Sequence, residues 1–403
     1  MTDTKTLIAE SQRYIANTYS RYPLVLVRGQ GCKVWSSDGR EYLDFVAGLA
    51  VCNLGHCHPK VVQAIQDQCR KLIHVSNFYH IEPQIELAKL LCENSFADRV
   101  FFCNSGAEAN EAAMKLAKKY AKDTGRADKF EIITMERSFH GRTMATVSAT
   151  GQDKFRKGFD PLLPGFKYVP FNDMEAVLRA VGPRTCAIML EPIQGEGGVN
   201  CPSDGYLRDL RELCRERGIL LIFDEVQVGM GRTGKLFAHE HDGVYPDIMS
   251  LAKSLAGGVP IGAMLATEKV AKSFSPGTHA STFGGNPLAT AAGVAAVSAL
   301  LEDGVLENCR RVGGHFFRRL MELKEKYPFV QEVRARGLII GMELAFEGGQ
   351  IVTRCMDEGF LINCTMGNVL RFLPPLIVTP EEVDQLIGVM DGIFGEYGEG
   401  VGS

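Results

Sequence analysis

The 403-residue sequence contains no apolar run close to the roughly 18 residues that a membrane-spanning helix needs. Its polar first residues, Met1 to Lys5, do not lead into the apolar segment of a secretory signal peptide. Both absences argue against a membrane-embedded or exported protein. We therefore expect no membrane partner and a cytoplasmic location.

The chain also lacks a strong excess of charge and a metal-type cysteine pattern. It carries 44 Lys and Arg against 48 Asp and Glu, a net charge of −4, so nothing points to a nucleic acid as a partner. Its 12 cysteines form no C-x-x-C pair, and His56-Cys57-His58 matches no zinc-ligand spacing. We expect no metal, and thiols that stay reduced in a cytosol.

Internal repeats and low-complexity segments are absent too, which leaves an ordinary globular chain. Strands alternate with helices from about residue 55 to 270, a pattern typical of an α/β fold with a mostly parallel, helix-covered sheet. A small strand meander precedes this region, with a hairpin turn at Asp38-Gly39. After a long helix that begins at Pro287, helices and short strands mix. We therefore expect three segments, 1–54, 55–300 and 301–403, of which the first and third together form a smaller α+β domain.

Some local expectations are specific enough to compare with a structure. The pattern predicts an N-terminal helix over 5–20. It also predicts a helix from Pro59 to Leu72 with four residues on its inner face, namely Val61, Ala64, Ile65 and Cys69. In the last segment, strands are expected near 330–334, 338–344 and 360–363, and the residues around Arg371 are assigned to no strand.

The central feature is the stretch Ile219 to Phe223, five apolar residues that predict a strand buried on both faces. It ends in Asp224 and Glu225, at the edge of the sheet where ligands of open α/β folds bind. The next strand, Asp247 to Ala252, leads to Lys253, and burial would lower the pKa of this lysine and make it a candidate for attachment to an aldehyde. A carboxylate and an amine on neighbouring strand ends suggest pyridoxal 5′-phosphate, because the carboxylate could hold the pyridine nitrogen.

A second strand end offers a place for a phosphate. The strand Arg99 to Cys103 runs into the small residues from Asn104 to Asn110, which open a helix. Backbone amides and the helix dipole at such a turn bind phosphate, although an ordinary N-cap by Asn104 or Ser105 would have the same sequence. Phe139 follows another strand and could stack on a planar ring, and Arg142 beside it could clamp a carboxylate.

Two other functions remain open on the residues alone. Gly229 to Gly234 fits the G-x-G-x-x-G pattern of dinucleotide-binding proteins, but it neither ends a strand nor opens a long helix. A nicotinamide-dependent oxidoreductase is therefore one alternative. A non-catalytic binding protein on the same fold is the other.

The motifs run in the order of a known family over nearly the whole chain. The matching stretches are Leu54–Pro59, Asn104–Asn110, Ser138–Thr143, Glu191–Gly198, Asp224–Gln227, Lys253, Ser281–Pro287 and Arg371-Phe372. With them the chain resembles the class-III, fold-type I aminotransferases, which depend on pyridoxal phosphate. Two departures, Ser254 where a glycine is expected and Ala107 where relatives often carry threonine, leave the implied roles unchanged.

The resemblance implies a role for each candidate residue. Lys253 and Asp224 would be catalytic, the lysine by holding the cofactor and moving a proton, the aspartate by keeping the pyridine nitrogen protonated. The implied cofactor-binding residues are Ser105, Gly106, Ala107, Phe139, Asp224, Glu225, Gln227, Lys253 and, reaching across a homodimer with shared sites, Thr282. The implied substrate-binding residues are Arg142, Glu196, Ser281 and Arg371.

The resemblance also implies a reaction. The distal (δ) amino group of N2-acetyl-L-ornithine would pass to 2-oxoglutarate, giving N-acetyl-L-glutamate 5-semialdehyde and L-glutamate, a step of arginine biosynthesis with ping-pong kinetics. Succinylornithine, ornithine and 4-aminobutyrate stay open as donors. Because one pocket must accept first a distal amine and then the α-amine of glutamate, we also expect Glu196, on a glycine-rich loop, to pair with Arg371 and hide its charge.

Overall fold

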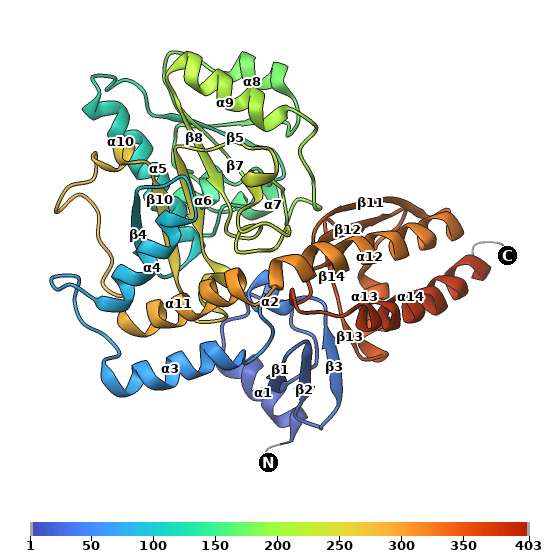
Figure 1. The fold of residues 1–403 in the computed structure, drawn as a ribbon. Coiled ribbons are helices and arrows are strands. Elements are labelled where there is room, and N and C mark those ends of the chain that lie inside the picture. The colour runs from blue at the N-terminus through green and yellow to red at the C-terminus, as the bar shows by residue number, and fades with distance from the viewer. Residues whose placement is uncertain (1–2, 401–403) are drawn as a thin grey trace.

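A seven-stranded sheet forms the centre of the large, upper part of the molecule in the computed structural model, which describes residues 3–400 (Figure 1). Its order is β4-β10-β9-β8-β7-β5-β6, and only β10 runs antiparallel to its neighbours. The expected mostly parallel α/β sheet is confirmed. The strands are β4 (Arg99–Cys103), β5 (Glu131–Met135), β6 (Phe166–Val169), β7 (Thr185–Leu190), β8 (Leu220–Asp224), β9 (Ile248–Leu251) and β10 (Gly262–Ala266).

Neighbouring residues of the central strands enter different hydrophobic cores, because successive side chains of a strand point to opposite faces. Ile222 packs in a core with helix α5 (Gly106–Asp123), whereas Leu221 packs in another with α9 (Tyr206–Arg217). All five residues of β8 are buried. This two-sided burial explains why the strand is an uninterrupted apolar run.

Two four-stranded sheets lie beside the large one. The first pairs the N-terminal strands with a strand from near residue 360, in the order β1-β2-β3-β13, and the second has the order β11-β12-β15-β14. The hairpin at Asp38-Gly39 is present, with Val34 opposite Tyr42. The strands are β1 (Leu26–Gln30), β2 (Lys33–Ser36), β3 (Glu41–Asp44), β11 (Val330–Arg336), β12 (Ile339–Leu344), β13 (Phe360–Leu361), β14 (Asn363–Thr365) and β15 (Val369–Phe372).

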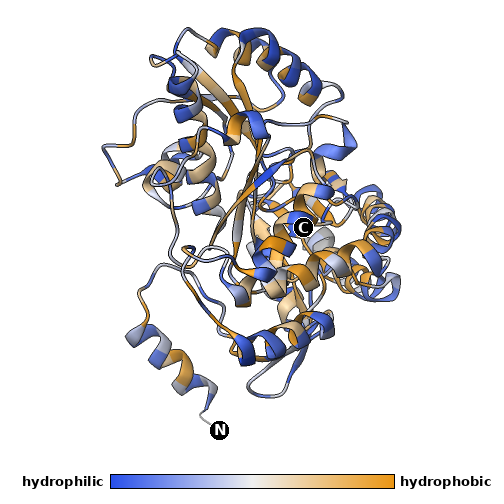
Figure 2. Ribbon diagram, turned by 60° about the vertical axis from the view of Figure 1, so that its left-hand side comes forward, coloured by the Kyte–Doolittle hydropathy of each residue, from blue (hydrophilic) through white to orange (hydrophobic). Residues whose placement is uncertain are grey.

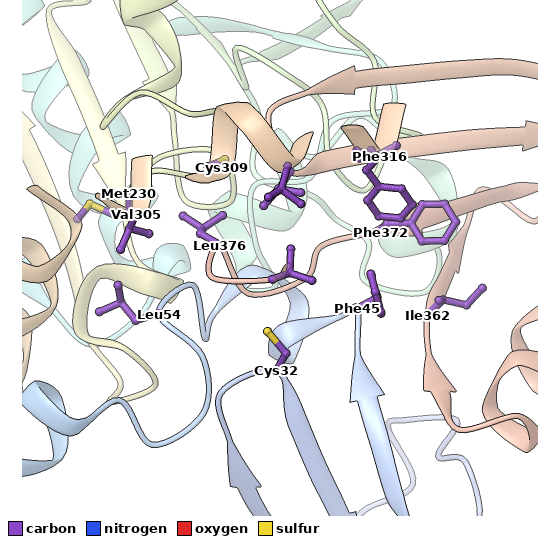
Figure 3. Close-up of a cluster of buried hydrophobic side chains, with 14 of the residues drawn as sticks. Cys32, Phe45, Leu54, Met230, Val305, Cys309, Phe316, Ile362, Phe372 and Leu376 are labelled. Atoms are coloured by element: carbon purple, nitrogen blue, oxygen red, sulfur yellow. The ribbon is translucent and has the colours of Figure 1, made fainter. Parts of the chain in front are cut away.

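An apolar cluster holds the N-terminal sheet, the C-terminal elements and the central loops together (Figure 3). Phe316 of helix α12 (Val305–Lys326) lies between Phe45 and Phe372, with ring centroids 5.8 and 5.2 Å away. Leu373 donates its backbone N–H to the carbonyl of Phe45. Segments from the two ends of the sequence therefore share one core.

The remaining helices cover the sheets and link them. The long α11 (Pro287–Glu302) packs against α3 and α4 and leads into α12, and Figure 1 shows this pair running below the large sheet toward the C-terminal part. The others are α1 (Thr4–Tyr14), α2 (Ala47–Ala50), α3 (Pro59–Lys71), α4 (Glu82–Glu93), α6 (Met144–Ala149), α7 (Asp153–Arg156), α8 (Met174–Ala180), α10 (Glu268–Ala271), α13 (Gly349–Asp357), α14 (Pro380–Gly400) and the 3₁₀ turns η1 (Ala238–His241) and η2 (Lys253–Ala256).

Three local expectations were wrong. Helix α1 ends at Tyr14 instead of residue 20, buries none of its residues and projects from the body in Figure 2. Of the four inner-face residues expected on α3, only Val61 is buried. Arg371 lies in the middle of a strand, β15, which is too short and too evenly buried to show an alternating pattern.

No single helix within residues 3–400 is long and apolar enough to cross a membrane. Helices α11 and α12 reach that length and composition only as a pair, which meets at a bend of 63°.

Candidate active site

Lys253 lies at the edge of the large sheet, two residues after the end of β9. Its backbone has a φ of +46°, in the left-handed region that side chains rarely adopt. Such strain is concentrated at functional sites. Burial and, to a smaller extent, the nearby charge of Arg371 together lower the pKa of the Lys253 amine to about 8. A neutral, nucleophilic amine is therefore populated near physiological pH.

Asp224, at the end of β8, is 3% exposed and held on both carboxylate oxygens. Its Oδ2 accepts hydrogen bonds from Nδ2 of Asn110 (2.7 Å) and Nδ1 of His140 (2.8 Å), and its Oδ1 accepts one from the backbone N–H of Val226 (3.0 Å). Because a carboxylate only accepts, the His140 proton lies on Nδ1. These donors fix the orientation of a buried negative charge.

Asn110 and His140 were not singled out from the sequence, although both lie in motifs that were. Their signal is positional: His140 follows the buried strand β5 closely, and Asn110 lies near the start of α5, just after the turn expected to bind phosphate. Within residues 3–400, the buried Nε2 of His140 and Oδ1 of Asn110 find no hydrogen-bond partner.

The turn between β4 and α5 has the features of an anion site. Ser105 is the N-cap, and its Oγ accepts from the N–H of Glu108 (3.2 Å), so the ordinary capping role is also present. The backbone amides of Gly106 and Ala107 donate to no acceptor in the described part of the chain. A Cβ at Gly106 would lie 2.7 Å from Cγ1 of Val226, which shows how closely the loop after β8 packs on this turn. Unused amides at the start of an 18-residue helix are suited to phosphate.

One cavity of about 450 Å³ joins these features. Its size and its chemistry fit pyridoxal phosphate: a buried carboxylate for a pyridinium nitrogen, a buried amine for an aldehyde, and unused amides for a phosphate. Sequence-predicted residues that line it are Ser105, Gly106, Ala107, Phe139, Arg142, Glu196, Asp224, Gln227 and Lys253.

The expected pairing of Glu196 with Arg371 is seen. Arg371 is 1% exposed, and its Nη1 lies 3.0 Å from Oε2 of Glu196. Asn363 on the neighbouring strand accepts from Nε (3.0 Å) and Nη2 (2.7 Å) of the same guanidinium. The hydroxyl of Thr365 donates to the carbonyl of Glu196 at 2.5 Å. The second small sheet therefore supplies both the cation and a tether for the glycine-rich loop Gly195–Gly198.

Arg142 is exposed at the cavity and lies over two aromatic rings. Its guanidinium carbon is 4.1 Å from the ring centroid of Phe155 and 5.5 Å from that of Phe139. The two rings meet edge to face at 5.4 Å. These contacts hold a cation at the rim while leaving its donors available to an anionic group.

Three predicted residues lie elsewhere. Glu225 points away from the cavity, because its carboxylate accepts from the backbone of Ala238 and from the backbone and Nδ1 of His239. It therefore holds η1 and does not line the cavity, although it was expected to bind the cofactor. Ser281 accepts from Nδ2 of Asn104 (3.2 Å), and Thr282 is exposed; neither lines the cavity of its own chain.

Comparison with known proteins agrees with this arrangement. The family model described as aminotransferase class-III matches residues 14–394. The chain belongs to the class-III aminotransferases. Members of this family use pyridoxal phosphate.

Relatives of this class-III chain match it over nearly its full length. The acetylornithine aminotransferase of Caldanaerobacter subterraneus subsp. tengcongensis is 53% identical over 97% of this chain and 99% of its own. The N-acetylornithine aminotransferase of Stenotrophomonas maltophilia has a TM-score of 0.84 at 41% identity, with 97% and 99% of the two chains covered. The ornithine aminotransferase of Toxoplasma gondii, described with partial occupancy of pyridoxal phosphate at its active site, has a TM-score of 0.96 at 37% identity, with 100% and 96% covered.

The structure also argues against the nicotinamide-dependent alternative. Gly229 to Gly234 lies in turns and opens no α-helix, so the nicotinamide interpretation has no structural basis. Within residues 3–400 no three His, Cys, Asp or Glu side chains come together as a metal-ligand set.

Proposed function

We propose that this chain transfers the δ-amino group of N2-acetyl-L-ornithine to 2-oxoglutarate, with pyridoxal phosphate as cofactor, in arginine biosynthesis. The observation that carries the proposal is the convergence of Lys253, Asp224 and the start of α5 on one cavity, with Arg371 behind Glu196. When bound, pyridoxal phosphate supplies an aldehyde that carries the amino group and a ring that withdraws electrons.

Residues of the chain would attach the cofactor, transfer a proton and hold the cofactor in place. Lys253 would attach the cofactor and later move a proton, for which a pKa near the working pH is suitable. Asp224 would hold the pyridine nitrogen in its protonated form, and the donors from His140 and Asn110 keep the carboxylate in place. The cavity residues Ser105, Gly106, Ala107, Phe139 and Gln227 would hold the phosphate and the ring.

Substrate choice would depend on two arginines. Arg142 at the rim would hold the α-carboxylate of acetylornithine, whose acylated nitrogen carries no charge to repel it. Glu196 would neutralise Arg371 during this half-reaction and move aside when glutamate or 2-oxoglutarate brings its own carboxylate. The flanking glycines lower the free-energy cost of that motion, because their backbone can adopt many conformations.

We also propose that the enzyme is a homodimer in the cytoplasm. Thr282 and Ser281 lie outside the cavity of their own chain, and an exposed loop is free to complete a second subunit's site. All 12 cysteines are free thiols, in accord with a reducing compartment.

A donor panel tests the proposed function. The pyridoxal-loaded protein is mixed in single turnovers with acetylornithine, succinylornithine, ornithine and 4-aminobutyrate, and conversion of the cofactor is followed by absorbance. Acetylornithine should react with the highest efficiency. Ornithine is the second candidate, because the Toxoplasma gondii ornithine aminotransferase has so similar a structure; a higher efficiency with ornithine or 4-aminobutyrate would refute acetylornithine as the preferred donor.

A further inference from the structure

We propose that Glu191 is a positioning residue that ties Phe139 to the glycine-rich loop Gly195–Gly198 and balances the charge around Lys253. This inference rests on the proposed function, because it assigns Glu191 to the same reaction. The residue follows β7, is buried and lines the cavity, and it was given no role from the sequence.

The two oxygens of Glu191 bind two different parts of the site. Oε2 accepts from the backbone N–H of Phe139 (3.0 Å), and Oε1 accepts from that of Gly195 (3.3 Å). Phe139 flanks the cavity, and Gly195 immediately precedes Glu196, which covers Arg371. One carboxylate thus connects the ring-facing residue to the residue that hides the substrate cation.

Glu191 differs from the other buried carboxylates of the described chain. Asp44, Glu131, Asp224 and Glu225 each have a cationic or histidine partner within 4.0 Å, whereas Glu191 has none. A buried carboxylate that relies on hydrogen bonds alone is costly for stability. In the described chain the two backbone amides are its only hydrogen-bond partners, so the presence of a buried charge here calls for an explanation.

The charge of Glu191 is coupled electrostatically to the charges around it, including that of Lys253. Burial, together with the negative charge of Asp224, raises its pKa to about 7, against an opposing influence from His140. Glu191 in turn raises the pKa of Lys253, as Asp224 and Glu196 also do, whereas Arg371 lowers it. The negative charge of Glu191 therefore favours a positive charge at Lys253.

Two variants separate the tethering role of Glu191 from the effect of its charge, and a third variant serves as a control. Glu191→Gln removes the charge and presents an NH₂ group to one of the two amide donors, so one hydrogen bond is lost. Glu191→Asp keeps the charge, but its shorter side chain reaches only one amide. Glu136→Gln is the matched control, because Glu136 follows the neighbouring strand β5 and is exposed. Thermal melting of all three identifies any variant that fails to fold.

Two readouts are measured on the pyridoxal-loaded proteins. The first is the pH midpoint of the visible absorbance of the cofactor, which reports protonation at Lys253. Glu191→Gln should lower it by about one unit, while Glu191→Asp should leave it in place. The second is the ratio of the acetylornithine to the glutamate half-reaction efficiency. It should fall about tenfold in both Glu191 variants, since a loosened Gly195 leaves Arg371 less well covered, and Glu136→Gln should change neither.

The proposal is overturned if a folded Glu191→Gln variant keeps both the wild-type midpoint and the wild-type ratio. Should this variant be unstable, an unchanged ratio in Glu191→Asp overturns the tether by itself. The wild-type protein is measured first. If it shows no visible band with pyridoxal phosphate, the proposed function fails, and that result is distinct from a failure confined to Glu191.

Discussion

Asp224 illustrates how neighbours prepare a single side chain for one task. Three hydrogen bonds hold its carboxylate in a buried position, so it can face a cation without reorientation. The negative charge is therefore available to a protonated ring nitrogen.

Replacing the charged carboxylate of Asp224 should greatly reduce the catalytic rate. We expect Asp224→Asn to bind pyridoxal phosphate but to lose at least about a hundredfold in kcat, because an amide cannot keep the ring nitrogen protonated. Steady-state kinetics and cofactor content by absorbance would be measured together. As the neighbouring control, Glu225→Gln should keep its rate, since Glu225 binds η1 instead of the cavity. Wild-type turnover in Asp224→Asn would remove Asp224 from the mechanism.

The lowered pKa of Lys253 predicts a pH dependence. The neutral amine reacts with an aldehyde, and in the folded protein it predominates above about pH 8 instead of the ordinary 10.5. The rate at which cofactor-free protein takes up pyridoxal phosphate should therefore rise with a midpoint near pH 8. Because Arg371 lowers this pKa, Arg371→Met should move the midpoint upward. A midpoint that stays in place in this variant would contradict the electrostatic coupling of the two residues.

Among the structural elements, the glycine-rich loop Gly195–Gly198 is held at several points. The hydroxyl of Thr365 in β14 donates a hydrogen bond to the carbonyl of Glu196. Arg334 of β11 donates to the carbonyl of Gly198 at 2.8 Å. The loop is thus attached to the sheet that carries Arg371, and movement of Glu196 is confined to its side chain and its flanking glycines.

This geometry gives a selective prediction for Glu196→Ala. An uncovered Arg371 would attract the α-carboxylate of acetylornithine inward and present the wrong end of the substrate. The acetylornithine half-reaction should fall about tenfold or more relative to that of glutamate, and α-amine transfer from ornithine should rise. Glu196→Gln, which keeps the size but not the charge, should follow Glu196→Ala. Equal changes in both half-reactions would leave Arg371 as a simple carboxylate anchor.

Strands and turns with strong local signals were predictable from the sequence, and long-range polar contacts were not. The apolar run Ile219 to Phe223 places Asp224 and, with the next strand, Lys253 at one sheet edge. By contrast, β15 contains four buried residues with no alternation, so nothing local marks Arg371 as part of a strand. The partners of Glu191 are backbone amides 52 and 4 residues away, and such contacts leave no side-chain pattern to read.

At the scale of the whole molecule, the site depends on three sheets meeting. The large sheet supplies Lys253 and Asp224, and the sheet β11-β12-β15-β14 supplies Arg371. The third sheet pairs β3 with β13, so the two ends of the sequence are joined beside the site. Val51, which follows β3 and α2 in the sequence, lines the same cavity.

A shared-site homodimer makes a prediction about mixed subunits. Lys253→Ala should be inactive, and Thr282→Val should bind the cofactor weakly, if Thr282 completes the partner's site. When the two variants are unfolded and refolded together in equal amounts, half of the dimers are hybrids, and each hybrid holds one intact site. Activity should therefore return to about a quarter of the wild-type value, by the statistics of a two-fold symmetric dimer. A mixture no more active than its Thr282→Val component would contradict the sharing of sites.

The assignment of Lys253 as the cofactor-holding amine is the central claim, and chemical trapping tests it most directly. The pyridoxal-loaded protein is reduced with borohydride, digested, and mapped by mass spectrometry for the lysine that carries the pyridoxyl group. The account predicts a single labelled peptide containing Lys253, and no label in the Lys253→Ala variant. A label on any other lysine, or none in the wild-type protein, would contradict it.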